Sequence, residues 1–151
     1  MRSGKTDNVS CGLYGKNFKE ILVQLIFDDR PFADQIMEVL DVNFLELEYL
    51  RVFVNKIVEY RTKYNIHPSS QALTSIFNTD LENESEVIQR QVREYFHKIQ
   101  IKEPTDIEYV KEQSLDFCRK QNLKKAMMKS VALLQNCSFD EISKTINDDL
   151  V

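Results

Sequence analysis

The sequence predicts an all-α protein, with a compact head of four to five helices followed by a C-terminal αα-hairpin. Glycine occurs only at Gly4, Gly12 and Gly15, so no later turn can use the residue that most readily takes positive φ. Apolar residues recur through the chain at the i, i+3, i+4, i+7 spacing of amphipathic helices. No segment shows the period-two alternation that is typical of a strand.

We expect the head to cover residues 17–103 and to open with two helices on either side of Asp28-Asp29-Arg30. The apolar stripe of the first helix consists of Phe18, Ile21, Leu22, Leu25 and Ile26. Pro31 suits the first turn of the second helix, whose stripe consists of Phe32, Ile36, Val39 and Leu40. A short break at residues 41–43 then leads to Phe44.

The third helix has the clearest pattern in the chain, formed by Leu50, Phe53, Val54, Ile57, Val58 and Arg61. It is expected to end at Tyr64-Asn65, because Asn tolerates the left-handed cap conformation. His67-Pro68 forces an extended step, and Ser69 or Ser70 then caps a short helix. That helix carries Leu73, Ile76 and Phe77, and after a polar turn at residues 78–84 another carries Ile88, Val92, Tyr95, Phe96 and Ile99.

Residues 104–151 predict the hairpin. Thr105 and Glu108 have the spacing of a capping box at the start of a helix that could run to about Gln135. Ser138 and Glu141 repeat that spacing before the last helix. Its apolar stripe needs a cover, which hairpins at chain ends often find on a neighbouring subunit. We therefore expect a subunit or primase interface, with the candidate residues Phe117, Met128, Val131, Phe139, Ile142, Ile146 and Leu150.

Length and composition limit the classes of function. The 151 residues suit one domain, preceded by a flexible polar arm at residues 1–16. A net charge of −4 gives no electrostatic footprint for non-specific nucleic-acid binding. Cys11, Cys118 and Cys137 fit neither a disulfide framework nor a CxxC metal site, which favours reduced thiols in the cytoplasm. No apolar run approaches the roughly 18 residues of a membrane-spanning helix, so no membrane partner is expected.

No residue pattern predicts catalysis, a metal or a cofactor in this chain. Ser3-Gly4-Lys5-Thr6 imitates the end of a phosphate-binding loop but lacks the earlier glycine and the preceding strand. His67 and His97 lack partners at metal-ligand spacing, so we expect both at surface or cap positions. Basic residues gather at positions 119–129. They could bind DNA or a partner, but charge complementarity with the helix dipole on a solvated face is the favoured interpretation.

Several segments resemble, in order and spacing, the N-terminal domain of DnaB-type replicative DNA helicases, in particular those of T-even-type phages. The segment EILVQLIFDDRPF, which starts at Glu20, is similar to the "ILxxLIxD" helix that opens that domain. Val52-Phe53 holds the place of an "IF" pair in a later helix. The segment YNIHPSSQAL, which starts at Tyr64, resembles a "YGxxPTxxAL" turn with Asn65 in place of glycine. The long helix that starts near Tyr109 is similar to the hairpin helix of the same phage proteins.

The resemblance implies a non-catalytic collar on a hexameric motor. In that family the hairpins pair between subunits, as a ring of dimers, and the collar docks the primase. ATP, Mg²⁺ and single-stranded DNA would be handled by a RecA-like motor domain of the full-length helicase, which lies outside this chain. The alternative is a stand-alone helical adaptor or a helicase-loader-like replication protein.

Overall fold

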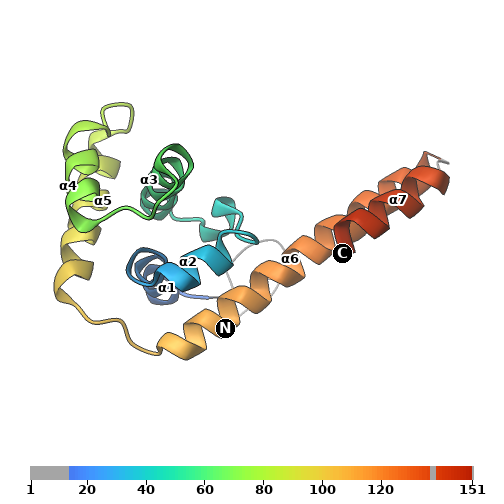
Figure 1. Ribbon diagram of the computed structural model, residues 1–151, viewed down its shortest axis with the longest axis horizontal. Helices are drawn as coiled ribbons and strands as arrows, with labels where there is room; N and C mark the ends of the chain where they lie inside the picture. Colours follow the sequence, from blue (N-terminus) through green and yellow to red (C-terminus); the bar gives the residue numbers. More distant parts are fainter. Residues whose placement is uncertain (1–13, 137–138, 151) are drawn as a thin grey trace.

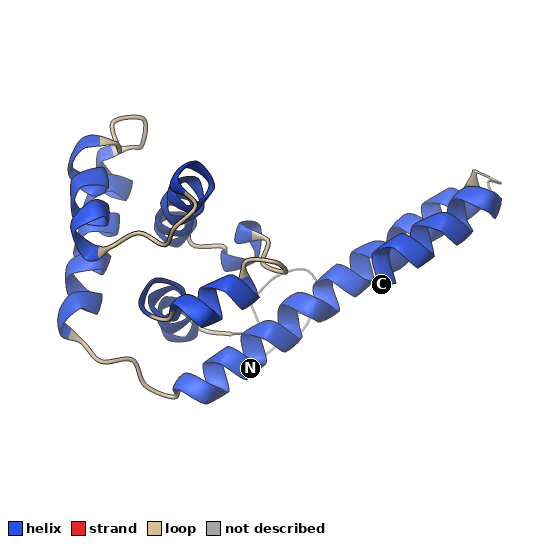
Figure 2. Ribbon diagram, in the orientation of Figure 1, coloured by secondary structure: helices blue, strands red, loops and turns tan. Residues whose placement is uncertain are grey.

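A computed structural model describes residues 14–136 and 139–150 of the chain, and in the last helix it describes the side chains of residues 143–148 (Figure 1). Within these ranges the chain forms seven α-helices, one 3₁₀ helix and no strand (Figure 2). The all-α fold class is therefore confirmed.

Five α-helices and the 3₁₀ helix η2 make up the head. Their bounds are α1 Lys16–Asp28, α2 Arg30–Ile36, η2 Val42–Leu45, α3 Glu48–Tyr64, α4 Ser70–Thr79 and α5 Glu86–Ile101. The long helix α6, Ile107–Gln135, passes along α1 and continues beyond the head. Helix α7, Phe139–Leu150, then folds back along the outer half of α6, so that the two form a projecting hairpin (Figure 1).

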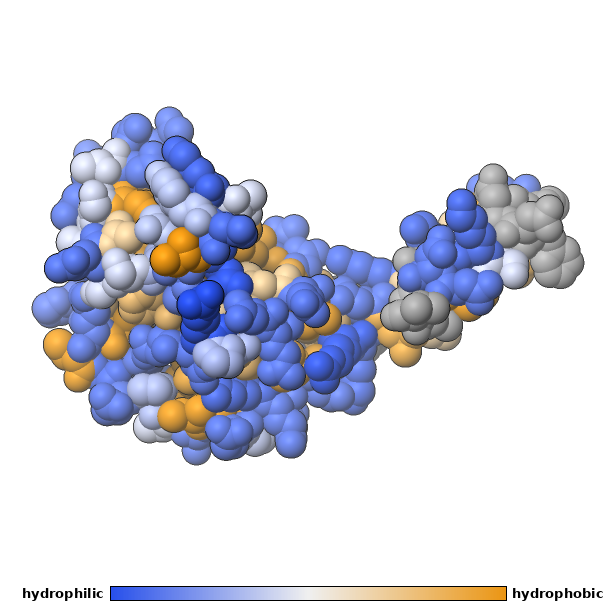
Figure 3. All heavy atoms as spheres, viewed as in Figure 1, coloured by the Kyte–Doolittle hydropathy of each residue, from blue (hydrophilic) through white to orange (hydrophobic). Residues whose placement is uncertain are grey.

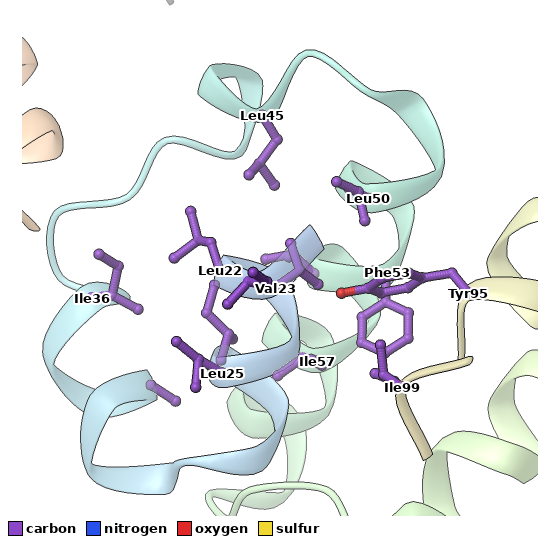
Figure 4. Packing of buried hydrophobic residues seen from close by; sticks show 14 of the residues in the cluster. Leu22, Val23, Leu25, Ile36, Leu45, Leu50, Phe53, Ile57, Tyr95 and Ile99 are labelled. Carbon is purple, nitrogen blue, oxygen red and sulfur yellow. The ribbon is translucent and has the colours of Figure 1, made fainter. Parts of the chain in front are cut away.

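Phe53 of α3 lies at the centre of the head's core. Its ring centroid is 5.0 Å from that of Phe77, 5.2 Å from that of Tyr95 and 5.9 Å from that of Phe96. Aliphatic side chains of α1 and α3 pack around this cluster, among them Leu22 (Figure 4). Such aromatic pairs contribute about 0.5–1.5 kcal/mol each beyond the area they bury. The core therefore joins α1, α3, α4 and α5 through the stripes that the sequence predicts.

Polar residues fix most of the helix ends in the head. Asp29 ends α1 and caps α2, because its side chain accepts a hydrogen bond of 3.1 Å from the Phe32 backbone N–H. Asn65 takes the left-handed conformation at the end of α3, with φ 61° and ψ 29°, as predicted. Of the two serines proposed as a cap for α4, Ser69 is the one whose hydroxyl accepts from the Ala72 backbone N–H. Ser85 caps α5 in the same way, a cap that was not among the predicted ones.

Three local predictions need correction. The capping box at Thr105 and Glu108 does not form, because α6 begins after Asp106, which has φ 54° and makes no side-chain cap bond. Helix α2 ends at Ile36, so Val39 and Leu40 lie beyond it, although both still pack against the core. The turn at residues 78–84 is not wholly polar, because Leu81 is buried in the core. The second proposed capping box, Ser138 with Glu141, lies outside the described residues and side chains.

The inner half of α6 belongs to the head rather than to the hairpin. Its buried residues include Val110, Ser114, Leu115, Phe117 and Cys118. Lys111 on this half pairs with Asp29 of the head at 2.6 Å, and Lys125, farther along α6, pairs with Asp41 at 2.8 Å. The hairpin is consequently shorter than the predicted segment of residues 104–151.

Tyr14, which falls in the predicted arm at residues 1–16, packs against the head. Its ring stacks on Phe18 at a centroid distance of 4.3 Å and meets Phe117 edge-on at 5.8 Å. The last residues of the predicted arm are thus part of the head. Residues 1–13 lie outside the described residues.

Candidate functional site

The outer half of α6 exposes a row of large apolar side chains. Leu123, Met127, Val131 and Leu134 are 44%, 61%, 54% and 61% exposed, and we call these four residues the hairpin stripe. At about 100° of rotation per residue they fall on one flank of the helix. Burying a side chain of this size fully stabilises a protein by roughly 1.5–3 kcal/mol. A continuous exposed row of this kind is typical of an interaction surface.

Helix α7 turns the hairpin stripe into one wall of a shallow groove. The groove has a volume of about 240 Å³ and is lined by Ala126, Met127, Ser130, Val131 and Ile146. The Ser130 hydroxyl donates a hydrogen bond of 3.0 Å to the Ala126 carbonyl of its own helix. The one hydroxyl in the lining is therefore already satisfied, and the groove suits apolar side chains of a partner. Some of the apolar atoms at the base of the hairpin are visible in Figure 3.

The structure brings two of the predicted interface residues together. Val131 and Ile146 line the groove from α6 and α7. Met128 is 62% exposed but is not in the lining, because it follows Met127 by one position and so lies about 100° around the helix. Leu123 and Leu134 were not predicted as interface residues. Their spacing of four residues from Met127 and three from Val131 would place them on the same face of a helix.

Phe117, which the sequence predicts at the interface, is buried against the head in the single chain. Phe117 is only 6% exposed, and its ring meets those of Tyr14 and Phe44 edge-on at 5.8 and 5.7 Å. It lies on the inner half of α6, where the head already covers it. The side chains of Phe139, Ile142 and Leu150 lie outside the described part of the chain.

The basic residues at positions 119–129 are partly engaged within the molecule. Lys120 pairs with Asp116 at 2.9 Å, and Lys125 pairs with Asp41 at 2.8 Å while its ammonium lies 5.1 Å from the Phe44 ring centroid. The hydrogen bond from Lys125 holds the pKa of Asp41 below its usual value. No basic residue occupies the last turn of α6, so the helix dipole does not explain their position. The position of Lys125 is better explained by its contacts with Asp41 and Phe44, which help to hold α6 on the head.

A second hollow, which we call the head pocket, opens where α2 and the end of α3 meet the α3–α4 turn. It has a volume of about 410 Å³ and is lined by Arg30, Asp34, Met37, Val58, Arg61, Thr62, Asn65, Ile66 and His67.

A chain of hydrogen bonds crosses the head pocket. Arg61 donates to the Asp34 carboxylate and, at 2.8 Å, to Nδ1 of His67. Because a guanidinium can only donate, Nδ1 accepts, and the proton of the neutral ring sits on Nε2, which donates to the Phe27 carbonyl at 2.8 Å. Burial lowers the pKa of His67, and the neighbouring Arg61 charge lowers it further, against the opposing effect of the Phe27 hydrogen bond. His67 is therefore a half-buried structural residue that bonds a carbonyl in the last turn of α1, which agrees with the cap position we expected and not with the surface position.

A buried carboxylate joins α1 to α3 and α5. Glu20 accepts hydrogen bonds from Tyr49 at 2.5 Å and from Lys98 at 2.8 Å, and Tyr95 donates to its backbone carbonyl. Burial tends to raise the pKa of Glu20, but the hydrogen bonds from Lys98 and Tyr49 outweigh it and the pKa is lowered. An ionised, fully bonded carboxylate of this kind fastens helices together, and it is not poised to transfer protons.

Within the described residues, no group of three His, Cys, Asp or Glu could hold a metal ion. In the same part of the chain, no helix has both the length and the apolar character needed to cross a bilayer. Comparisons of the chain with protein-family models, with curated proteins and with solved structures found no match.

Proposed function

We propose that this chain is the non-catalytic N-terminal collar domain of a DnaB-type replicative DNA helicase. In this role its hairpins pair between subunits to form a homo-oligomer, a dimer or a ring of dimers, and the collar docks the primase during DNA replication. The observation that carries the proposal is the hairpin stripe, exposed on a helix that projects from the head. The ordered segments that resemble this family give it independent support.

A second copy of the same hairpin is a suitable cover for the groove. Two hairpins meeting through this face would form a four-helix arrangement with Met127, Val131 and Ile146 near its centre. In a two-fold contact the same patch serves both subunits, so an apolar face is complementary to itself. The unbranched Met127 can adapt to the shape of the opposing side chains.

The collar role assigns no catalysis to this chain. ATP and Mg²⁺ would be bound by the RecA-like motor domain, and single-stranded DNA would be contacted through the full-length helicase. The protein would act in the cytoplasm, which for a phage-encoded protein is that of the host. We expect no ATPase activity from this chain alone.

Sedimentation of the full chain over a range of concentrations tests the pairing of hairpins. The wild type is expected to dimerise or to form larger species, and Met127→Glu is expected to shift it towards the monomer. Met128→Glu is a matched control, since Met127 and Met128 are 61% and 62% exposed on the same helix and only Met127 lines the groove. A wild type that stays monomeric, or a Met127→Glu variant that assembles like the wild type, would contradict the proposal.

The same measurement separates the collar from the alternative function. A stand-alone adaptor or loader-like protein would remain monomeric and cover its hairpin stripe only with a different protein. Docking is then tested by calorimetric titration of the full chain with the primase of the same replication system, for which the collar proposal expects a complex.

A further inference from the structure

We propose that the head pocket binds an acidic residue of a partner protein that stands next to an apolar residue. The pocket is separate from the hairpin groove, and the proposal does not depend on the collar function. It is supported by the charge of the lining, by the way its walls are held and by its apolar side.

The lining of the head pocket carries more positive than negative charge. Arg30 and Arg61 contribute two guanidinium groups against the single carboxylate of Asp34, and the tautomer described above keeps His67 neutral. The whole chain has the opposite balance, with a net charge of −4. The pocket is therefore a local positive site on an acidic protein, and electrostatic complementarity favours an anionic group in it.

Arg30 is the group that would take the carboxylate. It is exposed in the lining, and no hydrogen bond or ion pair among the described residues engages it. A guanidinium presents its donors in a planar fork that matches the two oxygens of a carboxylate. Arg61 is already bonded to Asp34 and His67, so it adds positive charge from a fixed position.

The walls of the pocket are held before any ligand arrives. The left-handed turn at Asn65 brings Ile66 and His67 back towards α2, and His67 is anchored to the Phe27 carbonyl at the end of α1. Arg61 is fixed at both ends of its guanidinium, and its side chain is only 22% exposed. Ordering these groups costs little on binding, because folding has already ordered them.

The apolar side of the head pocket favours an occupant that also carries an apolar side chain. Met37 and Val58 are half-buried in the lining, and Ile66 is 50% exposed at it. A volume of about 410 Å³ is more than one carboxylate fills, and it leaves room for an adjoining aliphatic side chain. Asp34 disfavours a doubly charged phosphate, and a single excess positive charge is too little for a nucleic-acid backbone. A peptide with an acidic residue beside an apolar one fits both parts.

The test is an NMR titration of the ¹⁵N-labelled full chain with three probes. The first is the capped dipeptide acetyl-Leu-Glu-amide, the second is acetyl-Leu-Gln-amide, and the third is sodium phosphate. We expect the Glu peptide to shift the backbone amides of Asn65, Ile66 and His67, with the Gln peptide and phosphate binding several-fold more weakly. Loss of one charge-assisted hydrogen-bonded pair in Arg30→Gln should weaken the Glu peptide about tenfold.

Lys63→Gln is the matched control. It removes the same charge from an exposed position on α3 that is outside the lining, so binding of the Glu peptide should persist. Met127→Glu should also bind it like the wild type, which separates this site from the hairpin. Equal binding of the two peptides, equal binding of phosphate, or an Arg30→Gln variant with unchanged affinity would each overturn the proposal.

Discussion

At Glu20 a single side chain holds three helices in place. Its side chain is 11% exposed, and desolvating an ion to this degree is unfavourable unless donors replace the lost water. Tyr49 of α3 and Lys98 of α5 supply those donors. Since the resulting pKa lies below the ordinary glutamate value of 4.5, the group stabilises the fold above pH 4.5. That contribution is lost as the pH falls through the lower, folded-state pKa.

Tyr49→Phe tests this network. The substitution keeps the ring and removes one donor to Glu20, so the free energy of unfolding should fall by about 1–3 kcal/mol, as measured by urea denaturation. Acid unfolding should also begin at a higher pH, because the pKa of Glu20 rises when the hydrogen bond is lost. Tyr60→Phe removes a hydroxyl from a half-buried ring on the same helix, and we expect a change within about 0.5 kcal/mol. Equal effects of the two substitutions would argue against the network.

His67 makes the fold sensitive to mild acid. Its pKa in the folded state lies below the ordinary histidine value of 6.5, so the unfolded chain binds more protons between these two pKa values. The contribution of neutral His67 is fully present above pH 6.5 and declines as the pH falls towards the folded-state pKa. In thermal unfolding, the difference between wild type and His67→Gln should therefore shrink on acidification. His97→Gln should keep the wild-type decline, since His67 is still present in it, and a constant difference for His67→Gln would contradict this account.

At the scale of elements, the sequence predicts helices well and burial less well. Each helical stripe of the head depends on local spacing alone, and so does the left-handed cap at Asn65. Burial of Leu81 and Phe117 depends on which distant segments come to lie against them. The residues next to Leu81 in the sequence do not predict its burial, since they form a polar turn. The predicted capping box at the start of α6 failed for a related reason. Asp106 takes a left-handed conformation there, and the identity of that residue alone does not predict it.

The end of α3 offers a matched pair of substitutions. Asn65→Ala must adopt φ 61° with a Cβ that disfavours it, which costs roughly 1–2 kcal/mol. Asn65→Gly removes that steric conflict, so its stability should match or exceed that of the wild type. Urea denaturation of both variants checks the order Gly above Ala. The reverse order would mean that the left-handed backbone conformation does not limit which residue can end this helix.

At the scale of the whole molecule, the head contains the core and the hairpin lies outside it (Figure 1). Val131 and Ile146 could be predicted as interface residues because each belongs to an apolar period within one helix. The head pocket could not, because Arg30, Arg61 and His67 come from different elements and are joined only by the fold. Sequence reasoning therefore finds sites built on one face of a helix more readily than sites built between segments.

This division predicts how protection against hydrogen exchange is distributed. Helix α7 packs against α6, and the hairpin stripe beside it stays exposed in a single chain, so the described part of the hairpin lies outside the core that protects the head from local opening. If hairpins pair, association stabilises the paired state more strongly as the protein concentration rises. Exchange measured by mass spectrometry should therefore slow in α7 and the outer half of α6 as concentration rises, while α3 and α5 exchange at an unchanged rate. Met127→Glu should remove that concentration dependence and Met128→Glu should keep it. Uniform slowing across head and hairpin would instead indicate association through another surface.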